Sequence, residues 1–119
     1  MKKRIYLILT LLVMFYACSS PAVKKAAEPA VQLEKVEPEI YSVEMVNMKF
    51  SPEELKVKKG DKVVFVNHDM MTHDVTEESK KAWSSSPLTT DKNWVLEVTE
   101  SVNYYCSIHP VMKGKIIVE

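Results

Sequence analysis

The feature that most constrains the fold is a series of short β-like runs that begins near residue 40. Tyr41, Val43 and Met45 alternate with outward-facing positions, and residues 63–66 are all β-branched or aromatic. Further runs of this kind are 55–57, 94–98, 102–106 and 116–118, whereas 77–92 has no strand periodicity. No long amphipathic helix interrupts them. About six to eight short strands of this kind predict an all-β fold, an antiparallel β-sandwich.

The first 18 residues are predicted to be an export signal. Residues 2–4 are basic, and residues 5–17 form a charge-free apolar run that is too short to span a bilayer. The run ends at Cys18 in a context that resembles bacterial lipoprotein signals, although residues 15–16 are larger than that pattern usually has. We therefore expect cleavage before Cys18 and lipidation of its thiol, with ordinary signal cleavage nearby as the alternative.

The next segment, residues 19–39, is predicted to be a linker. It combines proline with alanine, lysine and glutamate, has few large apolar side chains and shows no lasting periodicity. The alternative is a short helix within residues 22–36, interrupted at Pro29. In either case the folded domain is expected to cover residues 40–119.

The charge balance excludes several classes of partner. Lysine and arginine total 16, as do aspartate and glutamate, so the chain lacks the basic surplus that binding to a phosphate backbone requires. With two glycines in the chain and no P-loop or dinucleotide fingerprint, nucleotide chemistry is also disfavoured. No set of catalytic acid, base and nucleophile is evident, so we expect a protein that is not an enzyme.

The chemistry is concentrated near the C-terminus, where Cys106, His109 and Met112 follow one another at intervals of three residues on a loop between two predicted strands. Taken singly, Cys106 could be a buried thiol and Met112 a core residue. Together they place a thiolate, an imidazole and a thioether around one small volume. Soft sulfur ligands select copper, and two imidazoles, one thiolate and a weak axial methionine are diagnostic of a blue copper site. His73 is well placed to supply the second imidazole.

In this combination, the stretch from about residue 41 to residue 119 resembles the plastocyanin/azurin (cupredoxin) family, and the Cys106-x-x-His109-x-x-Met112 loop is similar to the short loop of the amicyanin type. Supporting matches are Met48-Lys49-Phe50, Lys59-Gly60-Asp61, Val66-Asn67 and the final residues 114–119.

The resemblance implies a cupredoxin-like Greek-key β-sandwich of about seven to eight strands with copper at one pole. It implies a single type 1 copper held by His73, Cys106, His109 and Met112, and one-electron transfer through the more exposed His109. The partners would be redox proteins of unknown identity. With the predicted signal, this indicates an exported monomer on the periplasmic or cell-surface side of a bacterial membrane, held there by a lipid anchor.

Four further residues are expected to surround the ligands: Asn67, Asp74, Ser107 and Ile108. Asp74 stands where the family commonly has asparagine, and we expect it to bond the Ser107 hydroxyl and so join the two ligand loops. Ile108 stands where the family typically has proline. Since Ile108 has an amide hydrogen, we expect a second backbone hydrogen bond to the Cys106 sulfur and a higher reduction potential.

Two other functions are compatible with the sequence. One is an extracytoplasmic copper chaperone or store, in which His68, Met70, Met71 and His73 bind Cu(I) and Cys106 is not involved. Within the blue copper interpretation, His68, five residues earlier in the same loop, is the alternative to His73 as the copper ligand. The second is a structural or adhesive lipoprotein without metal, in which Cys106 is only packed. Exposed apolar residues at the copper pole, including Met70 and Met71, are more simply explained as a docking surface.

Overall fold

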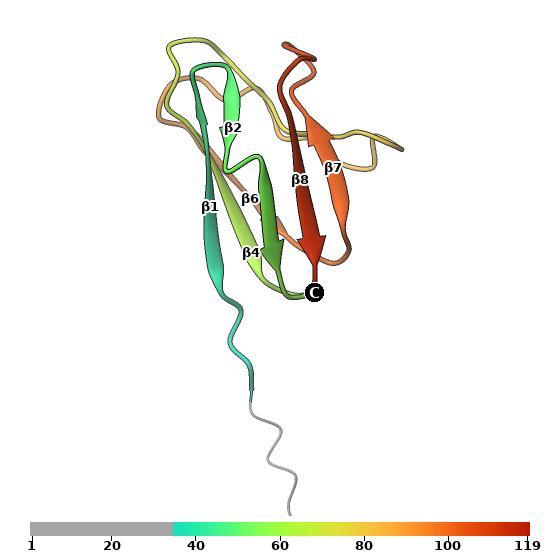
Figure 1. Ribbon diagram of the computed structural model, residues 1–119. Helices are drawn as coiled ribbons and strands as arrows, with labels where there is room; N and C mark the ends of the chain where they lie inside the picture. The colour runs from blue at the N-terminus through green and yellow to red at the C-terminus, as the bar shows by residue number, and fades with distance from the viewer. Residues whose placement is uncertain (1–34) are drawn as a thin grey trace, which may run out of the picture. The chain divides into compact units, whose positions relative to one another are not determined.

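The computed structural model describes residues 35–119 (Figure 1). The predicted signal, the site at Cys18 and most of the predicted linker lie outside the described residues. Residues 35–119 contain no helix, and therefore none that is long and apolar enough to cross a membrane.

Eight strands build the described part of the chain. They are β1 (Ile40–Val46), β2 (Lys49–Ser51), β3 (Glu54–Val57), β4 (Lys62–Asn67), β5 (Thr76–Glu77), β6 (Asn93–Glu97), β7 (Val102–Tyr105) and β8 (Lys113–Val118). The predicted all-β sandwich is confirmed. Two strands were not predicted, β2 and β5, and both are very short.

The strands form two four-stranded sheets, with the orders β2-β1-β4-β6 and β3-β8-β7-β5. The expectation of purely antiparallel sheets is wrong, because β1 pairs with β4 in parallel and β3 pairs with β8 in parallel. The chain leaves the first sheet after β2, enters the second at β3 and returns at β4. A strand that rejoins a sheet after such a crossing can run in the same direction as its neighbour. The remaining pairs are antiparallel.

The core lies between the two sheets and is built from alternate residues of each strand. Val43 and Met45 of β1 and Val63 and Phe65 of β4 have no exposed surface. From the other sheet, Tyr104 places its ring edge-on against Phe65, with centroids 5.1 Å apart. Since β7 continues this inward alternation, Cys106 also points into the interior, where it is fully buried.

Two connections meet at one end of the sandwich. β4 and β7 both run toward the end opposite the C-terminus, and the segments that follow them, residues 68–75 and 106–112, lie there (Figure 1). The first segment is tied to the long excursion that follows it, because His73 forms an isolated β-bridge with Leu88. The topology thus brings residues that are more than 30 positions apart in sequence to the same pole.

Candidate metal centre

Three of the predicted ligand residues meet at this pole. His73 Nδ1 lies 3.1 Å from His109 Nδ1, and the Cys106 sulfur lies 3.9 Å from each of these nitrogens. The centre of this triangle is about 2.1 Å from all three atoms, close to the roughly 2.0–2.3 Å of metal bonds to nitrogen and sulfur. Within residues 35–119, no other group of three His, Cys, Asp or Glu side chains comes this close together. The donor set therefore fits one trigonally bound ion.

The loop from Cys106 to Met112 is closed by its own backbone. The Cys106 amide donates to the Met112 carbonyl at 3.0 Å, and the Met112 amide donates to the His109 carbonyl at 2.9 Å. These bonds curl the loop so that its two ends lie side by side. Cys106 and Met112 are both buried, whereas His109 is partly exposed and provides the open side of the centre.

The loop that carries His73 is organised by Asn67, the last residue of β4, which is fully buried. Its Nδ2 donates to the carbonyls of Met71 at 2.7 Å and Leu88 at 2.8 Å, while its Oδ1 accepts the Asp69 amide at 2.8 Å. One amide side chain thereby satisfies two backbone groups of the loop and one of the neighbouring excursion. His73 is in turn paired through its backbone with Leu88, which fixes the backbone position from which its imidazole projects.

Asp74 connects the two loops as expected. Its carboxylate accepts the Ser107 amide at 2.6 Å and also the Ser107 hydroxyl, so the predicted hydrogen bond is present. The Asp74 amide donates to the Cys106 sulfur at 3.4 Å. A backbone donor of this kind stabilises the negative charge of a thiolate.

We expected a second backbone hydrogen bond, from the Ile108 amide to the Cys106 sulfur, and this expectation is wrong. In the described part of the chain, Asp74 is the one residue whose backbone N–H bonds to that sulfur. Before Ile108, Ser107 is bonded to Asp74, and after it, the His109 carbonyl accepts the Met112 amide. Ile108 therefore lies on the outer bend of the loop. Its side chain is 45% exposed.

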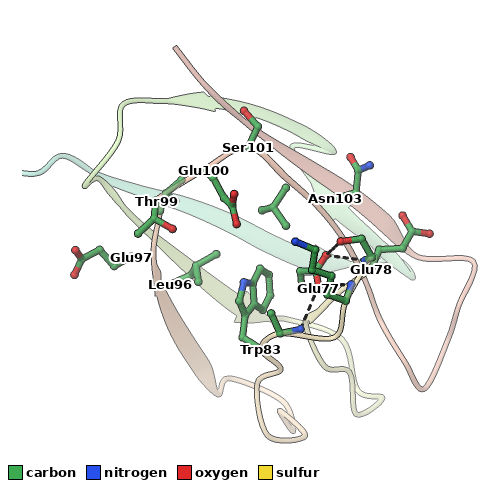
Figure 2. A pocket seen from close by; sticks show the side chains of 14 residues that line it. Glu77, Glu78, Trp83, Leu96, Glu97, Thr99, Glu100, Ser101 and Asn103 are labelled. Atoms are coloured by element: carbon green, nitrogen blue, oxygen red, sulfur yellow. Dashed lines mark hydrogen bonds between the residues drawn. The ribbon is translucent and has the colours of Figure 1, made fainter.

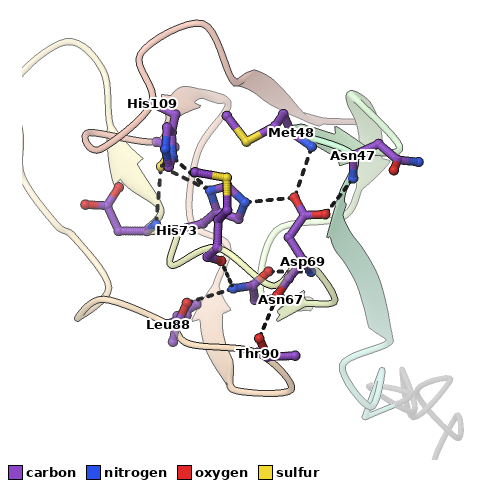
Figure 3. Close-up of polar contacts among 11 residues, drawn as sticks. Asn47, Met48, Asn67, Asp69, His73, Leu88, Thr90 and His109 are labelled. Atoms are coloured by element: carbon purple, nitrogen blue, oxygen red, sulfur yellow. Dashed lines mark hydrogen bonds and ion pairs between the residues drawn. The ribbon is translucent and has the colours of Figure 1, made fainter.

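Sequence reasoning missed Asp69, whose carboxylate lies 2.8 Å from His73 Nε2 (Figure 3). Desolvation raises its pKa. Hydrogen bonds from the Met48 amide, His73 and the Asn47 amide lower it and outweigh the desolvation, so the pKa of the Asp69 carboxyl lies below its usual value. The available signal was an acidic residue four positions before His73.

His68 does not join the triangle of donor atoms. The half-exposed imidazole of His68 faces two carboxylates, Glu44 at 4.0 Å and Asp91 at 3.7 Å. The side chains of Met70 and Met71 are 96% and 50% exposed, as expected for surface residues near this pole.

A hollow of about 530 Å³ lies elsewhere on the domain (Figure 2). Its lining includes Trp83, Leu96 and Glu97 and none of the predicted ligands. Glu77 borders it, but this carboxylate is occupied by bonds from the Ser79 amide and hydroxyl and from the amides of Lys80 and Ala82. The hollow is thus separate from the candidate metal centre.

Residues 7–118 match the cupredoxin-like domain. The chain belongs to the cupredoxin family. This cupredoxin is 30% identical over 99 residues to amicyanin from Paracoccus versutus, covering 78% of this chain and 75% of that one. It is 32% identical over 83 residues to amicyanin from Paracoccus denitrificans, covering 65% and 63%.

Solved structures agree with these relatives. A Cu(I) form of an amicyanin variant superposes with a TM-score of 0.63 at 30% identity, covering 71% of this cupredoxin and 87% of that chain. A copper-containing nitrite reductase from Thermus scotoductus gives the same TM-score and identity, but this cupredoxin spans 23% of its chain. The resemblance to the plastocyanin/azurin family, in its amicyanin-like form, is confirmed.

Proposed function

We propose that this cupredoxin is a one-electron carrier with a single type 1 copper ion. The supporting observation is the triangle of two imidazole nitrogens and one sulfur, together with the amicyanin relatives. His73, Cys106 and His109 would hold the ion through two imidazoles and one thiolate, and Met112, buried at the end of the same loop, would supply a weaker thioether ligand. When bound, copper supplies the one-electron chemistry by cycling between Cu(II) and Cu(I).

The contribution of the chain is to hold these ligands still. Cu(II) favours nitrogen and oxygen in tetragonal surroundings, while Cu(I) accepts few, soft ligands, so a fixed trigonal set is a compromise between them. The Asn67, Asp74 and backbone bonds described above hold both loops in one geometry. Because little has to rearrange between the two oxidation states, electron transfer meets a low barrier. No substrate pocket is required at the site, which is consistent with a carrier and not an enzyme.

Electrons enter and leave through His109. Its imidazole is partly exposed, whereas His73 is completely buried. The exposed apolar side chains of Met70, Met71, Ile108 and Val111 are at the same pole and form the surface on which redox partners dock. A redox partner would need an apolar patch that is complementary to this surface.

The place of action is outside the cytoplasm. The basic start and apolar run of residues 1–18 support export, and Cys18 is the lipid attachment site on the periplasmic or cell-surface side. Residues 19–39 form the tether, and residues 40–119 form the copper domain, which acts as a monomer.

A copper chaperone or store is the second candidate, supported by the exposure of Met70 and Met71. The structure favours the carrier, because His73 faces Cys106 and His109 while His68 faces carboxylates. A spectroscopic titration separates the two. Adding Cu(II) and then a reductant to the metal-free protein should give an intense visible band and a paramagnetic signal that both vanish on reduction and return on reoxidation. Tight Cu(I) binding without any such band would instead indicate a chaperone.

A further inference from the structure

The Asp69 carboxylate joins the His73 imidazole to a distant turn (Figure 3). One of its oxygens, Oδ2, accepts from His73 Nε2 at 2.8 Å and from the Met48 amide at 3.0 Å. The other, Oδ1, accepts the Asn47 amide at 2.8 Å. The side chain of Asp69 is 14% exposed, so these three donors replace most of its water.

The turn between β1 and β2 is shaped to receive this carboxylate. Asn47 and Met48 both have positive φ, 52° and 62°, which for a methionine is an unfavourable conformation. In this conformation two successive amides point at the same anion, an arrangement that suits a negative charge. The backbone of Asp69 is also fixed, because its amide donates to Asn67 Oδ1 and its carbonyl accepts the Thr90 hydroxyl, both at 2.8 Å.

The orientation of the acceptor decides which imidazole nitrogen carries the proton. A carboxylate at 2.8 Å from Nε2 requires a hydrogen on Nε2. The lone pair of the neutral ring is then on Nδ1, the nitrogen that faces Cys106 and His109. A carboxylate bonded to a ligating histidine also makes that ligand more basic, which favours the more highly charged metal.

Resting on the proposed copper function, we propose that Asp69 is a positioning residue that fixes the His73 tautomer through the Asn47–Met48 turn and lowers the reduction potential of the site. It acts through His73 and does not itself touch the metal. The negative charge next to the ligand stabilises Cu(II) more than Cu(I), so its removal raises the potential.

The test compares three variants of the full chain. Asp69→Asn removes the charge and keeps the size of the side chain, and Asp69→Glu restores the charge. Asp91→Asn is the matched control, since Asp91 is exposed and contacts His68 rather than His73. Its positive φ of 62° is also well suited to asparagine. The readouts are the reduction potential of the copper form and the histidine tautomers from long-range proton–nitrogen NMR of the metal-free protein.

We expect Asp69→Asn to weaken Cu(II) binding by about tenfold more than Cu(I) binding, which corresponds to a rise of about 59 mV. Asp69→Glu should return toward the parent potential, and Asp91→Asn should stay near it. In the NMR spectrum of the metal-free parent, the Nε2–H form of His73 should dominate.

An Asp69→Asn potential no higher than that of Asp91→Asn, or a parent protein in which neutral His73 carries its proton on Nδ1, would overturn the proposal. If the parent protein shows no copper-thiolate band, the proposed function fails instead. The tautomer of the metal-free protein still decides whether Asp69 positions His73.

Discussion

The bond between Asp74 and Ser107 should be essential for holding the two ligand loops together, and Asp74→Ala tests this. The substitution removes the acceptor of both the Ser107 amide and the Ser107 hydroxyl. It leaves the Asp74 backbone amide in place, so the hydrogen bond to the Cys106 sulfur is retained. The experiment therefore separates the joining of the loops from the electrostatics of the thiolate.

The expected loss of stability follows from the two bonds. A hydrogen bond to a charged group contributes about 1.5–3 kcal/mol. Ser107 is exposed, so water can replace part of what its donors lose. We therefore expect Asp74→Ala to lower the free energy of unfolding of the metal-free protein by about 2–3 kcal/mol. Ser107→Ala, which keeps the amide bond and loses the hydroxyl bond, should cost about half as much.

Asp74→Ala should weaken copper binding while changing the optical spectrum little. Loss of a group that orients metal ligands typically weakens metal binding by about 10- to 100-fold. Urea denaturation of the metal-free form measures the free energy of unfolding, and competitive Cu(II) titration measures the copper affinity. If Asp74→Ala matched the parent in both, the joining of the loops by Asp74 would be unimportant and the reasoning refuted.

Gly114→Ala should lower the free energy of unfolding by about 1–3 kcal/mol, because the added Cβ would overlap the buried ring of Tyr104. Parent-like stability in urea would contradict this close approach. Tyr104→Phe should raise stability by about 1 kcal/mol, since the buried hydroxyl has no hydrogen-bond partner; a clear loss in the same assay would count against it. The pKa of Glu77 is lowered from 4.5 to about 2, mainly by the hydrogen bond from the Ser79 hydroxyl. Desolvation raises this pKa, but hydrogen bonds from backbone amides lower it further. A lowered pKa stabilises the fold above about pH 4.5 and that contribution is lost as the pH falls toward 2. Urea melts at a series of pH values should therefore show Glu77→Gln with a weaker acid dependence than the parent.

The alternation of apolar residues was sufficient to predict most of the strands. It identified β1 and β6 because each is long enough for a period of two to be visible, while β4 was identified by its continuous run of β-branched and aromatic residues. Strands of two or three residues, such as β5 and β2, contain too few positions to show any period. Alternation also says which face of a strand is buried but not which strand lies beside it, so the parallel pairings could not be predicted.

The candidate site was predictable where its chemistry is local. The spacing of Cys106, His109 and Met112 points to one loop. His73 was expected from its place in the sequence and from the family resemblance, and the bond from Ser107 to Asp74 was expected because Asp74 departs from the family pattern. Asp69 was missed because its role depends on the amides of a turn that is more than 20 residues earlier in the sequence. Ile108 was misjudged for a related reason: the presence of an amide hydrogen is evident from sequence, but its direction depends on how the loop bends.

The binding of one copper ion by Cys106 and two distant imidazoles is tested most directly by visible spectroscopy. The spectra of the metal-free parent and of a Cys106→Ser variant are recorded during titration with Cu(II). We predict an intense charge-transfer band that saturates at one copper per chain in the parent and is absent from the variant. A variant that takes up copper with the same spectrum as the parent would contradict the account.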